Sequence, residues 1–227
     1  MWKDFLNVFR KSDLYTQALE ESHAMLDLGL AMFEASIETL RRSDDAGVAL
    51  DVHALDKRIN AYERDVRRKV FTHILVSGAH NLSSGLILVS VVIDIERIGD
   101  YAKNICDLAR SHLTRLHGGS LEPEVAAIET QVAEIFRNTV QAFRTGDADQ
   151  ARLIMSSYKD TLSAACESIV TRVISGQAND LSPADAAAVA LYVRYLKRIA
   201  AHSRNIGTSL VNPFHRLGYK EKREEPL

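Results

Sequence analysis

Apolar residues return every three or four positions along most of the chain, which is the spacing of amphipathic α-helices rather than the alternation of β-strands. In the first half the apolar stripes cover residues 19–40, 52–70 and 88–109. In the second half two stripes cover residues 125–143 and 154–173, and a further helix is marked by its end signals. The pattern therefore predicts six helices, three in each half of the chain.

Helix end signals support these boundaries in the second half. Gly146 follows the fourth stripe and is expected to end that helix. Asp147 with Gln150 three residues later has the form of a capping box, in which a side chain accepts hydrogen bonds from the first free backbone N–H groups. Ser182 opens the last helix with an equally clear signal, and Pro213 ends it.

The sequence Gly118-Gly119-Ser120 lies between the two sets of helices and predicts the boundary between two units. We expect an N-terminal three-helix unit at residues 1–117, a C-terminal three-helix unit at residues 121–212 and a flexible charged tail at residues 213–227. The predicted fold class is all-α, with two tandem three-helix bundles.

A short amphipathic segment precedes the first bundle helix, within residues 1–11. Trp2, Phe5, Leu6 and Phe9 fall at positions i, i+3, i+4 and i+7, so they share one helical face. We expect this face to pack on its own bundle or on a sister subunit. The alternative is contact with a membrane or a partner protein.

Composition narrows the class of protein. Hydrophobic residues make up 46% of the 227 residues, and only 11 Gly and 4 Pro interrupt the pattern, so the helices are expected to be long. The net charge of −2 argues against nucleic acid as a partner, because that interaction is driven by basic surface. The apolar run 86–93 is too short to cross a bilayer and no signal-peptide pattern opens the chain, so a cytoplasmic location is expected. Cys106 and Cys166 are expected to be reduced, buried thiols.

Acidic side chains follow the edge of two of the predicted helices. Glu96 and Asp100 lie one turn apart beside the apolar stripe of the third helix, and Asp56, Asn60 and Glu63 flank the stripe of the second. Hard cations such as Mg²⁺, Mn²⁺ or iron prefer such oxygen ligands, and carboxylates often bridge several ions. These five residues are the candidate metal ligands.

The alternative for these acidic edges is a set of solvated charges, with Arg97 and Lys103 available as ion-pair partners.

An internal repeat favours a functional role for the acidic edge. Residues 198–206 align without gaps to residues 97–105, with Arg, Ile, Asn and Ile identical at an offset of 101. In the second copy Lys197 replaces Glu96 and Ala201 replaces Asp100, so the C-terminal half lacks both carboxylates. Metal is therefore expected on the N-terminal half alone, and a metal-free protein remains an alternative.

The sequence Glu96-Arg97-Ile98-Gly99-Asp100, followed by Asn104 and Ile105, resembles the signature of the PhoU family of phosphate-uptake regulators. The resemblance extends over nearly the whole chain. It implies tandem three-helix bundles, multinuclear metal clusters on Glu/Asp-x-x-x-Asp edges in some members, and dimers or higher assemblies. It also implies a partner in phosphate transport or two-component signalling, such as a membrane transporter subunit or a sensor kinase at the inner face of the membrane.

The predicted function is therefore regulation of phosphate transport or phosphate signalling through protein contact, with Fe, Mn or Mg at the acidic edge. One alternative is a metal-free helical adaptor subunit of a phosphate transporter. A remote alternative is a di-metal carboxylate oxidase, but Glu20 and His23 form the single Glu-x-x-His pair of the chain, and such enzymes need two. Neither a nucleophile beside a base nor a glycine-rich phosphate loop is visible in the sequence, so no enzymatic activity is expected.

Overall fold

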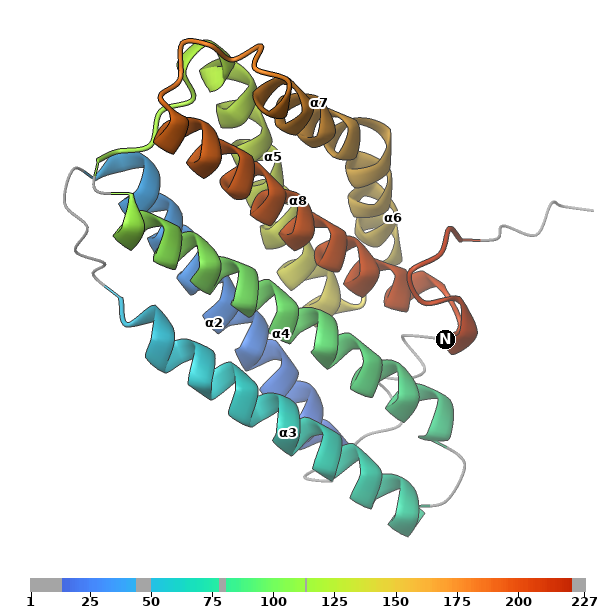
Figure 1. Ribbon diagram of the computed structural model, residues 1–227. Helices are drawn as coiled ribbons and strands as arrows, with labels where there is room; N and C mark the ends of the chain where they lie inside the picture. Colours follow the sequence, from blue (N-terminus) through green and yellow to red (C-terminus); the bar gives the residue numbers. More distant parts are fainter. Residues whose placement is uncertain (1–13, 44–49, 78–80, 113, 222–227) are drawn as a thin grey trace, which may run out of the picture.

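The protein is described by a computed structural model that covers residues 14–43, 50–77, 81–112 and 114–221 (Figure 1). The α-helices are α2 (Leu14–Arg42), α3 (Val52–Ser77), α4 (Leu82–Ser111), α5 (Glu122–Thr145), α6 (Ala148–Ser157), α7 (Ser163–Ile174) and α8 (Pro183–Val211). Short 3-10 turns lie at Gly119–Leu121 and Phe214–Arg216, and a π-helical segment, Tyr158–Leu162, joins α6 to α7. No β-strand is present in these ranges, so the all-α prediction is confirmed.

Three long helices form the N-terminal unit. α2, α3 and α4 pack against one another along their apolar stripes, with Phe33, Ile59 and Ile98 fully buried between them. In the C-terminal unit α5 and α8 pack with α6 and α7, which follow one another with a bend between them (Figure 1). The fifth predicted helix thus contains a π-helical interruption, and the two tandem three-helix bundles are confirmed.

The two units pack side by side through equivalent helices. α4 lies along α8, and α2 contacts α5, so the first and last helices of each unit meet their counterparts from the other unit. α4 and α8 run in opposite directions (Figure 1), which is the arrangement expected for two repeats related by an approximate two-fold axis.

The helix ends follow the signals in the sequence. The Asp147 side chain accepts hydrogen bonds from the backbone N–H groups of Asp149 and Gln150, both at 3.0 Å. The Gln150 side chain donates to Asn138 instead of returning to Asp147, so half of the predicted capping box is formed. Gly146 adopts φ 67°, in the left-handed region where glycine carries no steric penalty.

The segment after α8 differs from the flexible tail expected for residues 213–227. The Asn212 side chain donates hydrogen bonds to the carbonyl groups of Arg216 (3.1 Å) and Tyr219 (2.8 Å), and Glu221 pairs with Arg152 of α6 at 2.8 Å. These hydrogen bonds and the ion pair hold the segment after Pro213 back against the end of α8 and against α6. Residues 222–227 and the predicted amphipathic segment at residues 1–11 lie outside the described residues.

Both cysteines are buried and unpaired, as expected. Among the described residues, no helix combines the length and the apolar character that crossing a membrane requires.

Candidate functional site

The structure brings the five predicted ligand residues together along the contact between α3 and α4. We call this set, Asp56, Asn60, Glu63, Glu96 and Asp100, the acidic groove. Burial raises the pKa of the Glu96 carboxyl, and the nearby charges of Asp100, Glu63 and Asp56 raise it further against the opposing effect of Arg97. The two acidic edges therefore face each other, as the sequence predicted.

A glycine sets the close approach of the two helices at this point. A Cβ atom on Gly99 of α4 would lie 3.0 Å from the Ile59 Cδ1 atom of α3, which is tighter than ordinary van der Waals contact. Glycine at this position lets α3 and α4 approach until side chains from both helices reach the same ion or the same donor.

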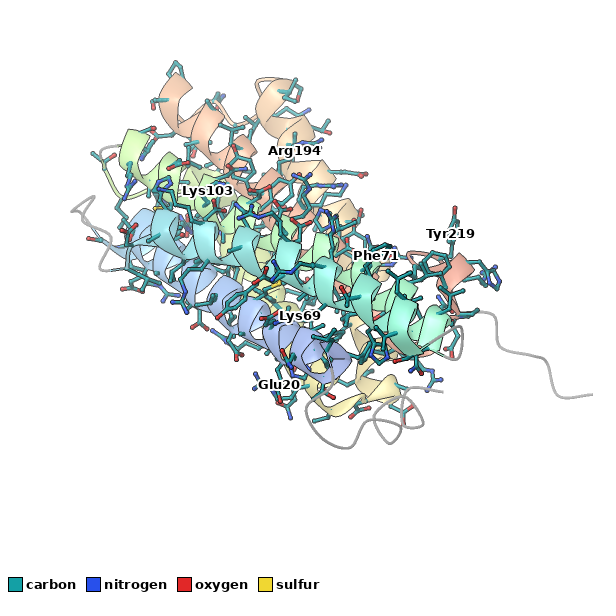
Figure 2. All side chains as sticks on the ribbon, turned by 90° about the horizontal axis from the view of Figure 1, so that it is seen from below. Glu20, Lys69, Phe71, Lys103, Arg194 and Tyr219 are labelled. Atoms are coloured by element: carbon teal, nitrogen blue, oxygen red, sulfur yellow. The ribbon has the colours of Figure 1, made fainter. Side chains whose placement is uncertain are left out.

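A lysine of the same helix occupies the middle of the acidic groove. Lys103 projects from α4 toward α3 (Figure 2), and its Nζ atom lies 3.0 Å from Asp56 Oδ1 and 3.0 Å from Asp100 Oδ1. Burial lowers the pKa of Lys103, but its hydrogen bonds to Asp100 and Asp56 outweigh that effect and leave the pKa raised. The bridging group is therefore a charged ammonium.

The remaining oxygen atoms of the two aspartates also have donors. Asn60 Nδ2 donates to Asp56 Oδ2 at 3.3 Å, and Arg97 Nη1 donates to Asp100 Oδ2 at 3.0 Å. Each of the four carboxylate oxygens is thus engaged by a hydrogen-bond donor of the chain.

The two glutamates of the acidic groove are paired less tightly. Glu63 pairs with Arg67 at 2.9 Å, while Glu96 Oε2 lies 3.5 Å from Arg97 Nε. Four carboxylates of the groove thus have Lys103, Arg97 and Arg67 as neighbouring cations.

Carboxylate and amide oxygens are the ligands that a hard cation prefers. The arrangement observed here nevertheless does not fit a metal ion. The position between Asp56 and Asp100 is filled by the Lys103 ammonium. Within the described ranges, no group of three His, Cys, Asp or Glu side chains is placed to hold a metal ion. The sequence identified the residue types and their meeting place, and metal binding there stays a prediction.

The C-terminal unit differs at the equivalent positions, as the repeat alignment indicated. Lys197 of α8 pairs with Glu167 of α7, and Ala201 offers no ligand atom. A cavity of about 320 Å³ beside this pair includes Cys166, Thr171 and Arg194 in its lining. Burial raises the pKa of Cys166 to about 11, so its thiol is protonated at neutral pH.

A second polar cluster joins the two units, and sequence reasoning missed it. His202 Nδ1 lies 2.7 Å from Asp94 Oδ1, which also accepts a hydrogen bond from Asn205 at 3.1 Å. Arg198 donates to His202 Nε2 (3.1 Å) and to the Tyr101 hydroxyl (3.2 Å). Because arginine only donates, His202 Nε2 accepts here and its Nδ1–H donates to Asp94.

The repeat offset contained a signal for this cluster. Tyr101 and His202 occupy equivalent positions in the two copies, and their rings stack with centroids 5.8 Å apart at 24°. Residues on an approximate two-fold axis meet their own counterparts, so an offset of 101 pairs these two.

Comparison with protein-family models identifies two PhoU domains in the chain, at residues 23–109 and 126–210. The first match falls within α2, α3 and α4 and the second within α5 to α8. Each match thus corresponds to one three-helix unit.

Three curated relatives are named phosphate-specific transport system accessory protein PhoU homolog. The Pseudomonas putida protein is 29% identical over 171 residues, which are 74% of this chain and 66% of that protein. The Pseudomonas aeruginosa protein is 27% identical over 74% of this chain and 70% of its own length. The Synechocystis sp. protein is 24% identical over 88% of this chain and 83% of its own length.

Two crystal structures share the fold. PhoU from Pseudomonas aeruginosa superposes with a TM-score of 0.76 at 22% identity and covers 87% of this chain and 95% of that chain. The phosphate transport system regulatory protein PhoU from Streptococcus pneumoniae gives a TM-score of 0.75 at 17% identity, with 87% and 93% covered.

Proposed function

Since the chain belongs to the PhoU family, we propose that it is an accessory protein of a phosphate transport system and regulates phosphate transport or phosphate signalling by binding other proteins. The observation that carries this proposal is the pair of PhoU domains, one on each three-helix unit. The curated relatives bear the name of a phosphate-specific transport accessory protein, although the first of them is matched over only 66% of its length.

Protein binding rather than catalysis is the proposed mode of action. The Glu20 and His23 pair, on which an oxidase would depend, does not converge on one site. Glu20 is exposed on α2, whereas the His23 ring packs edge-on against Phe143 of α5 with centroids 5.5 Å apart. PhoU proteins are regulatory accessory proteins, and this chain is proposed to act in the same way.

The end of α3 offers a surface for such a partner. Phe71, Leu75 and Val76 are 65%, 69% and 81% exposed, within the last two turns of the helix. Figure 2 shows Phe71 in the C-terminal half of α3, away from the acidic groove residue Lys103. Large apolar side chains gathered in solvent are typical of a surface that a partner covers.

The proposed partner is a membrane phosphate transporter subunit or a sensor kinase, met in the cytoplasm at the inner face of the membrane. Self-association into a dimer or larger homo-oligomer is part of the same proposal. An Fe, Mn or Mg ion on the five groove residues stays a prediction, and the metal-free adaptor is its alternative.

The test is phosphate uptake in cells of the source organism that lack the gene. At a fixed external phosphate concentration, loss of the gene is expected to change the rate of radiolabelled phosphate uptake, and the wild-type gene to restore it. If uptake and phosphate-responsive transcription are both unchanged by the deletion, the proposed function is contradicted.

A variant pair tests the proposed surface in the same cells. The double variant Phe71→Ser and Leu75→Ser is expected to fold but not to restore uptake. Leu153→Ser on α6 is the matched control, because Leu153 is 68% exposed and lies in the other unit. Restoration by both variants would reject the surface and leave the proposed function standing.

A further inference from the structure

The acidic groove already contains a cation that belongs to the chain. Lys103 Nζ contacts one carboxylate oxygen from α3 and one from α4, both at 3.0 Å. Its side chain is 23% exposed, and those of Asp56 and Asp100 are 11% and 25% exposed. The ammonium thus links the two helices in a partly buried position, which is the role of a bridging ion.

We propose that the Lys103 ammonium takes the place of a divalent metal ion between Asp56 and Asp100, so that the acidic groove of this chain works without metal. Lys103 is then the residue that determines the ion specificity of the groove.

Hydrogen-bond geometry supports the view that the Lys103 ammonium stands in the place of a metal ion. A divalent ion bridging α3 and α4 would need the Asp56 Oδ1 and Asp100 Oδ1 atoms, and both now accept from Lys103. To bind there, the ion would have to displace a partly buried ammonium from two anions. The outer oxygens of the two aspartates are engaged as well, because Asn60 and Arg97 donate to them.

Lys103 competes strongly with a free metal ion because it is covalently attached to α4. A cation attached to the same helix three residues from Asp100 is present at a high effective concentration, whereas a free ion loses translational freedom when it binds. Millimolar free metal ion is therefore expected to be too dilute to displace the lysine.

The C-terminal unit also has a lysine at the contact between its last two helices. Lys197 of α8 pairs with Glu167 of α7, just as Lys103 of α4 pairs with Asp56 of α3. In both units a lysine on the last helix crosses to a carboxylate on the helix before it. An ion pair from a lysine between these two helices is thus common to the two repeats, although the lysines stand at different positions of the alignment and Glu167 is 68% exposed.

The experiment compares the full-length wild type with Lys103→Met after dialysis against a chelator and then into chelator-free buffer. Melting temperatures are measured by circular dichroism with and without 1 mM Mn²⁺, and bound Mn²⁺ by electron paramagnetic resonance. The wild type is expected to bind no Mn²⁺ and to keep its melting temperature within about 1 °C.

Without metal, Lys103→Met is expected to melt lower than the wild type, because two carboxylates lose their shared cation. It is expected to bind Mn²⁺ and to gain about 5–10 °C when the ion is present at a hundred times its dissociation constant.

Two controls separate the site from general charge effects. Lys57→Met removes an exposed lysine of α3 and is expected to show no response to Mn²⁺. Adding Asp100→Asn to Lys103→Met is expected to abolish the gain in melting temperature. If Lys103→Met does not fold, Lys103→Gln keeps a polar side chain but removes the positive charge, so it is expected to bind Mn²⁺ in the same way.

Three results would overturn the proposal. The first is a wild type that carries at least one metal ion per chain when purified without chelator. The second is a Mn²⁺-induced stabilisation of the wild type as large as that of the lysine variant. The third is a helical lysine variant that ignores Mn²⁺, since Lys103 would then not be what keeps the ion out.

Discussion

The acidic side chains of the groove have different electrostatic surroundings although the sequence presents them alike. Asp100 accepts from Arg97 and Lys103, each at 3.0 Å, so its negative charge is compensated. The pKa of Glu96 is raised by burial and by Asp100, Glu63 and Asp56, so ionising it opposes folding. Substitutions at the two positions should therefore act in opposite directions.

We predict that Glu96→Gln stabilises the metal-free protein at pH 7, while Asp100→Asn destabilises it. Relief of the repulsion one turn away is worth about 0.2–0.5 kcal/mol, and loss of the paired carboxylate costs about 1 kcal/mol. Urea unfolding monitored by circular dichroism measures both changes.

The pH dependence of the Glu96→Gln effect follows from the direction of the pKa shift. A carboxyl with a raised pKa in the folded state destabilises the fold above that pKa, and this penalty is absent below the ordinary value of 4.5. The gain from Glu96→Gln should thus shrink as the pH falls through this range. A gain that is equal at pH 7 and pH 4 would show that ionisation of Glu96 is not its source.

Helix boundaries in the C-terminal unit depend on single side chains. α6 begins at a turn where Gly146 takes a positive φ and Asp147 accepts two backbone hydrogen bonds. Ser182 caps α8 in the same way, with its Oγ accepting from the Asp185 N–H at 3.1 Å. Such caps satisfy backbone donors that the helix itself leaves free.

Asp147→Ala is predicted to lower the free energy of unfolding by about 1 kcal/mol, because the first-turn N–H groups of α6 lose their acceptor. Glu134→Ala removes the same charge from an exposed position inside α5 and should change stability by less than about 0.5 kcal/mol. Thermal or urea unfolding of the two variants makes the comparison. Equal losses would mean that charge, not capping, is responsible.

The two units are held together by a buried arginine as well as by apolar packing. Arg41 at the end of α2 is 7% exposed and pairs with Glu129 of α5 at 3.1 Å and with Glu122. Its guanidinium also donates to the Leu116 carbonyl and lies 5.9 Å from the centre of the Tyr192 ring. One side chain thus joins α2, the segment between the units, α5 and α8.

We predict that Arg41→Ala lowers the free energy of unfolding by about 3–5 kcal/mol, because Glu122 and Glu129 lose the buried cation that they share. The neighbouring Arg42 is 60% exposed, and Arg42→Ala should cost less than about 1 kcal/mol. Denaturant unfolding of both variants distinguishes a buried link from a surface ion pair. A small loss of unfolding free energy in both variants would show that apolar packing, not Arg41, holds the two units together.

Removal of residues 1–11 tests the role of the amphipathic segment in the whole molecule. Its apolar face would be exposed if it had no partner, so truncation is expected to weaken association with a sister subunit or a partner protein and to leave the bundles folded. Melting temperature and mass in solution are the measurements. If the truncated chain unfolds, the segment belongs to the core. If association is unchanged, the segment plays no part in it.

The sequence by itself determined the helices, their order and their duplication. Apolar spacing and capping residues act over a few positions, so the stripes and the signals at Gly146, Asp147 and Ser182 were sufficient to predict the fold class. The motif from Glu96 to Asp100 indicated the family, and the offset of 101 indicated two equivalent units. These features are local or repeated in the chain, and the structure keeps them, with one π-helical segment, Tyr158–Leu162, inside the fifth predicted helix.

Only the tertiary structure decided which side chain pairs with the carboxylates of the acidic groove and how the two units pack together. Arg97 and Lys103 were both available to the carboxylates in the sequence, but the close approach of α3 and α4 at Gly99 places the lysine between Asp56 and Asp100. Contacts between side chains far apart in sequence, such as Asp94 with His202, depend on the crossing of two helices. Periodicity fixes which face of a helix is buried but not which partner that face meets, and this is why the position of Lys103 between Asp56 and Asp100 had to come from the fold.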